Sequence, residues 1–378
     1  MGSINKKKVS FLIPRITHGG SERIFIQISN YLANNSNYEI EFFLNGSEES
    51  QNHLLDKKIR IFSKTNISYR KYLYYLIKYY NSSKPNIVFT SLYIIGFVAL
   101  IARFFSKHKP KIVFGAHNAL SYKINFPDNK SDKFVLNFLA KYLLNKADKV
   151  ISVSKGVGDE LIQEFGLDSS KLIIIYGPTL NKKIIDKYIT HECNHRFFKL
   201  KKYKIITCLG RLSPQKGYDI ILKSFAKFIK KFKAKLIIIG EGSEKIKLEK
   251  ICLKLCLNQH VSFIGSQKNP YKFIAKSDIF LTASRWEGLS IAIIDALSTG
   301  TNVVATNCKY GPSEILDNGK FGILTKVNCE KDLLRGMIRS ITKKNSHSSK
   351  LKNKSRAKYF FNLNPEKVYL ELIDELLK

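Results

Sequence analysis

The sequence predicts an α/β protein built from two doubly wound domains, each a parallel sheet with helices on both faces. Short β-branched runs alternate with helical patterns along the whole chain, and strands spaced by helices in this way form parallel sheets. The series runs once through the first half, breaks at Gly177-Pro178, and starts again after Thr190. Two series indicate two domains, and 378 residues are enough for two or three cores.

Each series supplies its own candidate strands. In the first domain they are residues 9–13, 40–44, 87–91, 112–116, 150–153 and 172–175, and in the second they are residues 204–209, 235–239, 261–264, 279–282, 302–305 and 322–324. The last part of the chain has a helical pattern throughout. We therefore expect a first domain at residues 1–190, a second at 191–345, and C-terminal helices at 346–378 that can cross back to brace the first domain.

The net charge of +34 is the strongest feature of the composition. It is spread over the chain, with +14 on residues 1–190 and +20 on residues 191–378, so it does not come from a basic tail. Such a charge favours phosphates, nucleic acid or an anionic membrane, although a lysine-rich composition bias is an equal alternative. We expect no nucleic acid partner, because the sequence holds no recognisable DNA- or RNA-reading module.

Several other classes are excluded by what the sequence lacks. The six cysteines are scattered without zinc spacing and are interpreted as buried, reduced thiols. The sequence contains no Asp-x-Asp, P-loop or nucleophile elbow, and we expect neither a metal nor a cofactor. No secretory signal opens the chain, and the longest nearly apolar run, residues 93–105, is too short to span a bilayer. We therefore expect a cytoplasmic location.

Residues 284–296 carry the strongest indication of chemistry. Glu287 precedes a glycine turn, and the apolar run after the turn predicts a buried helix whose N-terminus favours phosphate. Asp295 lies inside that helix, where a carboxylate is costly unless it is hydrogen-bonded. A phosphate seat between two acids that can bind hydroxyls suggests a nucleotide-sugar. The alternative is a Ser290 N-cap and one acid with a partner in the core.

The loop after strand 204–209 supplies two cations. Arg211 and Lys216 lie five residues apart around a proline turn. An arginine acts as a bidentate fork and a lysine as a point charge, so both can bind one diphosphate and neutralise a nucleoside diphosphate leaving group. Ordinary surface basicity is the alternative.

Three further loops follow predicted strands at the edge where open parallel sheets bind ligands. Gly19 and Gly20 let backbone N–H groups approach an anion, but they do not form the dinucleotide pattern, which disfavours nicotinamide. His117 directly follows strand 112–116, and a structural role is its alternative. Glu241 lies between two glycines that permit a close backbone approach to a ligand such as a base.

Together these residues resemble the family-4 retaining glycosyltransferases of the GT-B fold. The matching segments follow the family's order across nearly the whole chain, at residues 19–23, 116–118, 147–156, 210–217, 240–244, 284–300 and 311–316. The resemblance implies two Rossmann-like domains facing across a cleft, the first for an acceptor and the second for a nucleotide-sugar. It further implies metal-independent transfer of a hexosyl unit, with an N-acetylhexosamine as one option, from a UDP-linked donor. The implied acceptor is a glycan or lipid-linked glycan in cell-surface polysaccharide or glycoconjugate biosynthesis.

The same resemblance implies roles for individual residues. Arg211 and Lys216 hold the diphosphate, Glu287 contacts sugar hydroxyls, and His117 contacts the transferred sugar. The other implied substrate-binding residues are Gly19, Gly20, Glu241, Gly288, Leu289, Ser290 and Asp295. Asp295 stands where the family usually has a glutamate that binds the ribose, and it is one methylene shorter, which puts that contact in doubt.

A tyrosine-rich segment, residues 66–80, mixes six tyrosines with Arg70, Lys71 and Lys78. Aromatic and basic side chains together are typical of a membrane interface. We predict reversible binding to anionic lipid at the inner face of the cytoplasmic membrane, with a core helix carrying solvated lysines as the alternative.

Three other functions stay open at this stage. One is another GT-B enzyme, such as a sugar-nucleotide 2-epimerase or a phosphorylase. A basic nucleic-acid binder is suggested by charge alone, and a non-catalytic sugar-binding scaffold is suggested by Asp295.

Overall fold

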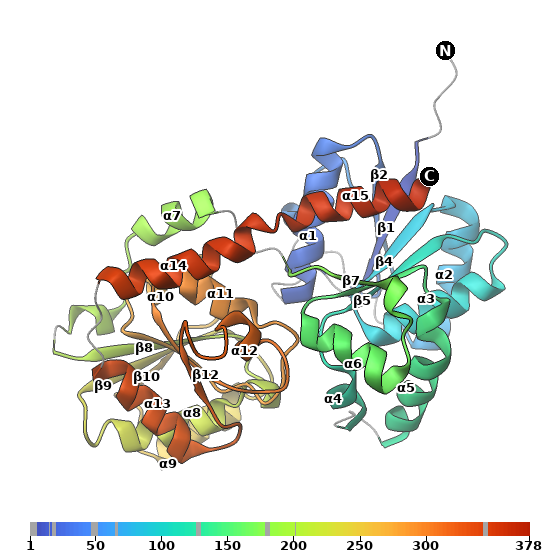
Figure 1. Cartoon of the computed structure of the whole chain (residues 1–378). Helices are drawn as coiled ribbons and strands as arrows, with labels where there is room; N and C mark the ends of the chain where they lie inside the picture. The colour runs from blue at the N-terminus through green and yellow to red at the C-terminus, as the bar shows by residue number, and fades with distance from the viewer. Residues whose placement is uncertain are drawn as a thin grey trace. The chain divides into compact units, whose positions relative to one another are not determined.

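The computed structural model describes residues 6–14, 16, 20–46, 52–64, 67–125, 130–177, 182–200, 202–342 and 347–378. The chain folds into two compact units. Unit 1 comprises Met1–Pro178 with Asn364–Lys378, and unit 2 comprises Thr179–Leu363 (Figure 1). Compactness alone does not define a folding domain, so the boundaries at residues 190 and 345 stay predictions.

Unit 1 contains a seven-stranded parallel sheet in the order β3-β2-β1-β4-β5-β6-β7. The chain builds the sheet outward from β1 in one direction and then, from β4, in the other, so the order reverses between β1 and β4. The strands are β1 Lys8–Ile13, β2 Glu39–Leu44, β3 Arg60–Ser63, β4 Ile87–Thr90, β5 Lys111–Ala116, β6 Lys149–Ser152 and β7 Leu172–Ile174.

Helices alternate with these strands. They are α1 Gly20–Asn35, α2 Tyr69–Ser83, α3 Tyr93–Phe105, α4 Leu120–Asn125, α5 Lys130–Leu143 and α6 Lys155–Phe165, with short 3₁₀ turns at η1 Asn52–Leu54, η2 Leu144–Lys146 and η3 Ser169–Lys171. Ser68 caps α2 by accepting a hydrogen bond from the Lys71 amide, and Ser154 caps α6 in the same way from Val157.

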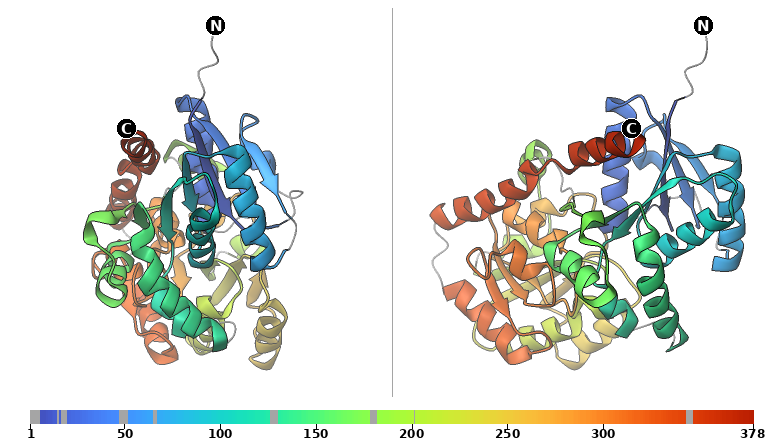
Figure 2. Two further views of the ribbon diagram at one scale, coloured as in Figure 1. Left: turned by 90° about the vertical axis from the view of Figure 1, so that its right-hand side faces the viewer. Right: turned by 45° about the vertical axis from the view of Figure 1, so that its right-hand side comes forward.

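The last helix of the chain, α15 (Pro365–Leu377), completes unit 1 by packing across α1 (Figure 2). Its buried face includes Tyr369, whose ring centroid lies 5.4 Å from that of Phe89 in β4. Gln27 in α1 donates a hydrogen bond of 2.5 Å to Glu366. The C-terminal residues therefore belong to the core of the unit that the N-terminal residues begin.

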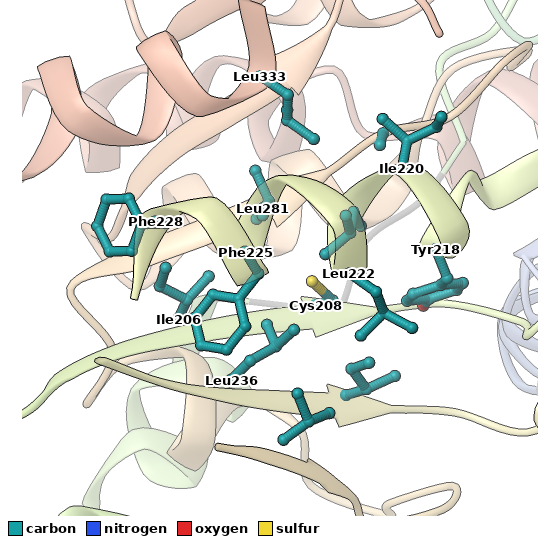
Figure 3. Close-up of a cluster of buried hydrophobic side chains, with 14 of the residues drawn as sticks. Ile206, Cys208, Tyr218, Ile220, Leu222, Phe225, Phe228, Leu236, Leu281 and Leu333 are labelled. Carbon is teal, nitrogen blue, oxygen red and sulfur yellow. The ribbon is translucent and has the colours of Figure 1, made fainter. Parts of the chain in front are cut away.

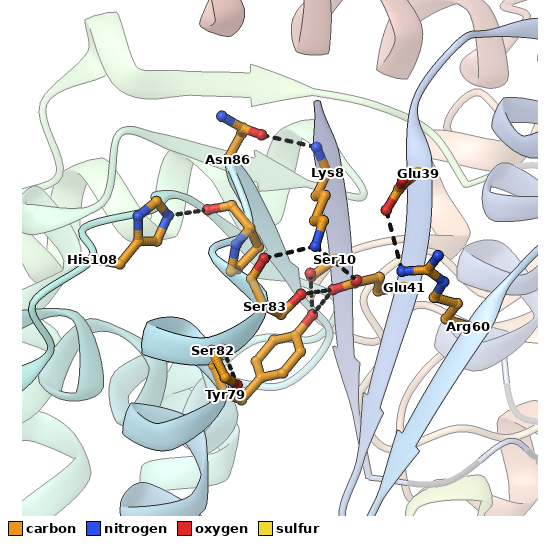
Figure 4. A network of polar contacts seen from close by, with 11 residues as sticks. Lys8, Ser10, Glu39, Glu41, Arg60, Tyr79, Ser82, Ser83, Asn86 and His108 are labelled. Atoms are coloured by element: carbon orange, nitrogen blue, oxygen red, sulfur yellow. Dashed lines mark hydrogen bonds and ion pairs between the residues drawn. The ribbon is translucent and has the colours of Figure 1, made fainter. Parts of the chain in front are cut away.

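A buried polar network joins α2 to the sheet (Figure 4). Glu41 in β2 is fully buried and accepts hydrogen bonds from the Tyr79 hydroxyl at 2.5 Å and the Ser83 hydroxyl at 2.6 Å. The Tyr79 oxygen is also 2.5 Å from the Ser10 hydroxyl, and Lys8 lies 3.9 Å from Glu41. Burial, followed by the charge of Glu41, raises the pKa of Tyr79. Tyr79 is therefore an anchor of the core, not of a membrane interface.

Unit 2 contains a six-stranded parallel sheet in the order β10-β9-β8-β11-β12-β13, which reverses between β8 and β11. The strands are β8 Lys204–Leu209, β9 Ala234–Ile239, β10 Val261–Phe263, β11 Ile279–Thr282, β12 Asn302–Thr306 and β13 Ile323–Thr325. The helices are α7 Lys182–Thr190, α8 Tyr218–Phe228, α9 Lys245–Lys254, α10 Tyr271–Ile274, α11 Ile291–Ser298, α12 Pro312–Ile315, α13 Glu330–Thr342 and α14 His347–Asn362, with 3₁₀ turns at η4 Arg196–Lys199 and η5 Pro214–Lys216.

The main core of unit 2 lies between α8 and the sheet (Figure 3). Tyr218, Leu222 and Phe225 recur at helical spacing along one side of α8 and are buried among strand residues such as Cys208 and Leu236. This packing fixes the start of α8, and with it the loop that joins β8 to α8.

The structure confirms the predicted α/β class with two parallel sheets, and it contains one strand that the sequence pattern missed. β3 is only four residues long, lies at the edge of its sheet, and has no buried residue. A short edge strand of this kind lacks the apolar run from which the other strands were predicted.

Candidate active site

The candidate site lies at the switch point of the unit 2 sheet, beyond the carboxyl ends of β8 and β11. The β8 loop (residues 210–217) and the β11 loop (residues 283–290) follow these two neighbouring strands. Open parallel sheets bind ligands at this position. Both loops carry residues that the sequence singled out.

Lys216 and Glu287 meet between the two loops. The Lys216 Nζ atom donates to Glu287 Oε1 at 2.5 Å, and the Ser284 hydroxyl donates to the same oxygen at 2.6 Å. The Glu287 side chain is only 6% exposed, whereas that of Lys216 is 20% exposed. The carboxylate is therefore held in one place by two donors, while the cation beside it can still be reached by a ligand.

Gly217 allows this close approach of the loops. Its φ of 62° lies in the left-handed region, and a Cβ atom at this position would lie 2.1 Å from the carbonyl oxygen of Ala283. Only glycine fits both constraints. The glycine therefore brings the turn that carries Lys216 against the end of β11.

Arg285 ties the same two loops together, and sequence reasoning gave it no role. Its guanidinium donates two hydrogen bonds to Asp219, at 2.8 and 3.0 Å, and others to the Pro214 carbonyl and, at 2.8 Å, to the Asn328 side chain. Its backbone N–H donates to the Gln215 carbonyl at 2.7 Å. Burial by itself would raise the pKa of Asp219, but the hydrogen bonds and charge of Arg285 outweigh it and lower that pKa.

Arg211 shares the β8 loop with Lys216, and the Lys216 stem lies over Gly210 next to it. The Arg211 side chain is exposed, and within the described part of the chain it has no hydrogen bond or ion pair. The structure therefore brings Lys216 and Glu287 into contact, and it leaves Arg211 beside them without a fixed partner.

The backbone has an unusual conformation at the N-terminus of α11. Ser290 occupies the N-cap position with a left-handed φ of 68°, and its side chain makes no capping hydrogen bond. Ser290 is therefore the N-cap residue, as in the alternative interpretation, but it caps α11 without a side-chain hydrogen bond. Left-handed backbone in a non-glycine residue costs energy and recurs at ligand-binding sites. Gly288, Leu289 and Ser290 are all buried at this turn.

Asp295 is buried in α11, and its Oδ1 atom accepts a hydrogen bond of 2.9 Å from the Tyr271 hydroxyl. The core partner that the sequence left unseen is thus on α10. The predicted ribose contact of Asp295 stays a prediction.

Glu241 lies on the loop after β9, next to the β8 loop. The Leu212 N–H donates to the Glu241 carbonyl at 2.8 Å, and the Glu241 carboxylate is exposed near Gly265. A Cβ atom on Gly240 would lie 2.0 Å from the Gly210 carbonyl, so the two loops pack backbone to backbone.

Cys308 is a buried thiol close to the same charges. Burial raises its pKa, the charge of Glu287 raises it further, and the charge of Lys216 opposes this. Cys308 follows β12, and the end of that strand supports the β11 loop, because the Thr306 hydroxyl donates to the Ser284 carbonyl at 2.6 Å.

In unit 1, His117 follows β5 as predicted. Both ring nitrogens are shielded from solvent and have no hydrogen-bond partner among the described residues, although the residue as a whole is half-buried. Burial lowers the pKa of His117 to about 4. A neutral imidazole with unsatisfied nitrogens is uncommon in a protein interior and calls for a partner. Gly20 begins α1, and Gly19 lies outside the described residues.

The described residues contain neither a metal-binding cluster nor a membrane-spanning helix. No group of three or more His, Cys, Asp or Glu side chains is arranged to hold a metal ion. No helix within the described ranges is long and apolar enough to cross a membrane.

Two parallel doubly wound sheets, with a charged loop site at a switch point, define the GT-B class of folds. Comparison with known proteins agrees: residues 18–179 match the family model described as Glycosyltransferase Family 4, and residues 192–358 match that of Glycosyl transferases group 1. The chain belongs to the family-4 glycosyltransferases.

Individual relatives support this assignment. The chain is 30% identical over 266 residues, 70% of each protein, to the N-acetylgalactosamine-N,N'-diacetylbacillosaminyl-diphospho-undecaprenol 4-alpha-N-acetylgalactosaminyltransferase of Campylobacter jejuni. It is 25% identical over 256 residues to the poly(ribitol-phosphate) alpha-N-acetylglucosaminyltransferase of Staphylococcus aureus, which covers 67% of this chain and 47% of that one. In fold it is similar to Anabaena HepE in complex with UDP and glucose, with a TM-score of 0.80, 19% identity, and coverage of 98% and 100% of the two chains.

Proposed function

We propose that this glycosyltransferase moves a hexosyl unit, with an N-acetylhexosamine as the first candidate, from a UDP-linked sugar to a glycan or lipid-linked glycan acceptor. The donor site is the switch point of unit 2. The observation that carries the proposal is the contact of Lys216 and Ser284 with the buried carboxylate of Glu287, beside the N-terminus of α11. The names of the Campylobacter and Staphylococcus relatives support the sugar class, and the Anabaena complex supports the nucleotide.

In this proposal the cations act on the leaving group. The bond between the sugar C1 and the diphosphate oxygen breaks, and negative charge develops on the diphosphate. Lys216 and Arg211, together with the N-terminus of α11 at Ser290, stabilise that charge, so no metal is required. Glu287 accepts hydrogen bonds from sugar hydroxyls. The Ser284 hydroxyl fixes the position of the Glu287 carboxylate, and the fixed carboxylate orients the sugar for attack.

The acceptor hydroxyl then forms the new bond at C1. We propose that it attacks on the face from which the diphosphate leaves, and that the hydroxyl proton passes to a diphosphate oxygen. The anomeric configuration is retained by this route. The two unpartnered ring nitrogens of His117 support the proposal that it binds a hydroxyl of the transferred sugar as a neutral imidazole.

Other contacts in this proposal hold the donor. Asp295 binds the ribose, directly or through a water, and Glu241 lies at the base end of the site. Gly19 and Gly20 approach the β-phosphate and the acceptor.

We also propose that the protein works at the inner face of the cytoplasmic membrane, in reversible contact with anionic lipid. The net charge of +34 supports this, because anionic headgroups attract cationic surfaces. An acceptor carried on a lipid would be presented at that surface.

A donor screen tests the central proposal. Thermal unfolding is measured with UDP-, GDP- and ADP-sugars, since a ligand that binds the folded state raises the melting temperature. We expect UDP and UDP-N-acetylhexosamines to raise it, and the variants Arg211→Ala and Lys216→Ala to lose the shift. Product NMR then reports the anomeric configuration. Interconversion of the UDP-sugar without any acceptor would identify an epimerase instead and overturn the proposed transfer.

A further inference from the structure

Unit 1 exposes two aromatic pairs on neighbouring helices. Phe104 and Phe105 end α3 with 76% and 64% of their surface exposed, and their ring centroids lie 5.1 Å apart. Phe138 and Tyr142 lie one turn apart on α5, are 51% and 62% exposed, and have centroids 4.5 Å apart. Single exposed apolar residues are ordinary, but paired aromatic rings in solvent mark a surface that binds something.

The two pairs belong to one region of the surface. α3 packs against both α2 and α5 (Figure 1). Arg103, at the end of α3, donates to Asp148 at 2.6 Å and to the Lys146 carbonyl, and both residues follow α5 closely in the chain. Lys109 donates to the carbonyls of Arg103 and Phe104 at 2.7 and 2.6 Å, which fixes the last turn of α3. We call the surface formed by Phe104, Phe105, Phe138 and Tyr142 the aromatic face.

The charge around this face has one sign over a long stretch of sequence. Between Asp56 and Asp128 the chain holds 13 lysines and arginines and no acidic residue. All 30 acidic residues of the chain therefore lie elsewhere, which a general lysine bias does not explain. Arg70, Lys71 and Lys78 are exposed on α2, Lys107 is exposed just after α3, and Lys141 is exposed on α5.

The tyrosines of α2 contribute less than the sequence suggested. Tyr72, Tyr79 and Tyr80 are buried in unit 1, whereas Tyr69 and Tyr74 are exposed. Half of the six tyrosines therefore serve the core. The apolar part of an interfacial surface must therefore come from α3 and α5.

We infer that the aromatic face, with the exposed Lys107 and Lys141 next to its rings in the chain, docks on a bilayer rich in anionic lipid. Aromatic rings favour the depth of the headgroups, and lysine and arginine favour the anionic surface above them. A second copy of the chain fits less well, because it would bring the exposed cations beside the two faces, Lys107 and Lys141, together. The inference rests on the membrane contact proposed above, and it adds the surface that makes the contact.

Vesicle flotation tests the surface. The probes are vesicles of equal parts phosphatidylcholine and phosphatidylglycerol, and vesicles of phosphatidylcholine alone. We expect the wild type to bind the anionic vesicles and to be released by salt. Phe104→Ser/Phe105→Ser should bind at least about tenfold more weakly, because two exposed rings no longer leave water. Lys107→Gln/Lys141→Gln should lose about tenfold and show a weaker salt dependence.

The matched control is Ile246→Ser/Leu253→Ser, which removes two apolar side chains that are 68% and 61% exposed on α9 of unit 2. It should bind vesicles like the wild type. If the Phe104/Phe105 variant binds vesicles as tightly as the wild type, the aromatic face is not the surface that binds the membrane. The proposed membrane contact itself would not be contradicted. Absence of wild-type binding would overturn both. A wild-type dimer that the Phe104/Phe105 variant disperses, without vesicle binding, would assign the face to a second copy.

The donor proposal is checked separately in the same samples. UDP should raise the melting temperature of the Phe104/Phe105 variant as much as that of the wild type. Loss of the UDP shift in the wild type itself would count against the donor site and not against the aromatic face.

Discussion

Lys216 Nζ and Glu287 Oε1 lie 2.5 Å apart, on loops that follow the adjacent strands β8 and β11. In this arrangement the cation assigned to the diphosphate is already paired with the acid assigned to the sugar. A donor that carries both a diphosphate and a sugar must either bind beside the Lys216–Glu287 ion pair or break it. The pairing therefore links binding of the diphosphate to binding of the sugar.

Neutralising Glu287 should separate binding of the diphosphate from binding of the sugar. In Glu287→Gln, Lys216 loses its anionic partner, so we expect UDP to bind at least as tightly as to the wild type. Sugar transfer should fall by about 10²-fold or more, because the sugar loses a fixed acceptor of hydrogen bonds. Calorimetric titration with UDP and a transfer assay report the two quantities. Weaker UDP binding in this variant would show that the pair does not compete with the diphosphate.

Removing the cation should have a structural cost as well. Lys216→Ala leaves the Glu287 carboxylate buried without its counter-ion, which we expect to lower the free energy of unfolding by about 3 kcal/mol. The double variant Lys216→Ala/Glu287→Gln should recover much of that stability but no transfer activity. Additive losses of stability in the two single variants would contradict a direct interaction.

Arg285 should act as a positioning residue. Its fork binds Asp219 with two hydrogen bonds and spans the two loops, and a lysine cannot reproduce this geometry. We expect Arg285→Lys to lower kcat about tenfold or more, with a smaller change in KM, because Lys216 and Glu287 lose their alignment. Lys227→Gln provides a control, since it removes an exposed ion pair to Glu330 away from the loops. A change in KM alone would indicate a binding role for Arg285.

Gly217→Ala tests the close approach of the loops. Alanine at this position would combine a left-handed φ with a Cβ atom 2.1 Å from the Ala283 carbonyl, so the turn must move. We expect loss of transfer. We also expect the free energy of unfolding to fall by clearly more than the roughly 1–2 kcal/mol that left-handed strain alone costs. Gly166→Ala is the matched control, because Gly166 has a φ of 69° but no atom within 4 Å of its Cβ position. Similar losses of stability in Gly217→Ala and Gly166→Ala would rule out the contact with the Ala283 carbonyl as the cause.

His117 predicts a pH dependence of stability. Its pKa is about 4 in the folded chain, below the ordinary value near 6.5, so the unfolded chain binds more protons between these values. The stability that neutral His117 contributes is present above about pH 6.5 and is lost as the pH falls toward 4. We expect the urea midpoint to drop over this window in the wild type, and to drop less in His117→Gln.

His108→Gln controls for histidine removal in general. His108 lies in the same unit and its Nε2 atom is 2.7 Å from the Pro85 carbonyl. A smaller pH-dependent drop in His117→Gln than in His108→Gln would assign the difference to His117. An unchanged profile in His117→Gln would mean that the pKa of His117 does not differ between the folded and the unfolded chain.

Much of this architecture could be predicted from residue patterns, and the exceptions have physical reasons. Buried parallel strands are continuous apolar runs, which is why the strands of unit 2 were found, whereas β3 has four residues and none is buried. Lys216 and Glu287 were predicted to share a ligand because each lies just after a strand, and strand ends meet at one edge. The Arg285 clamp depends on distant partners, Asp219 and Asn328, that no local pattern connects to it.

Burial of individual side chains was harder to predict. The sequence does not distinguish the tyrosines of α2 from one another. In the structure Tyr79 is buried, and its hydroxyl donates a hydrogen bond to the buried carboxylate of Glu41. Asp295 required a partner, but nothing in the sequence pointed to Tyr271 on α10. Phe104 and Phe105 end an apolar run that predicts a core helix, and only the structure shows that the last turn of α3 leaves the protein interior.

The place of α15 has a consequence for biosynthesis. Unit 1 starts with β1, but the helix that covers α1 and contacts Phe89 through Tyr369 is encoded at residues 365–377. A ribosome therefore releases all of unit 2 before the first unit can close. Until then α1 and Phe89 lack their contacts with α15, and the first unit of the nascent chain depends on the last part of the sequence for its completion.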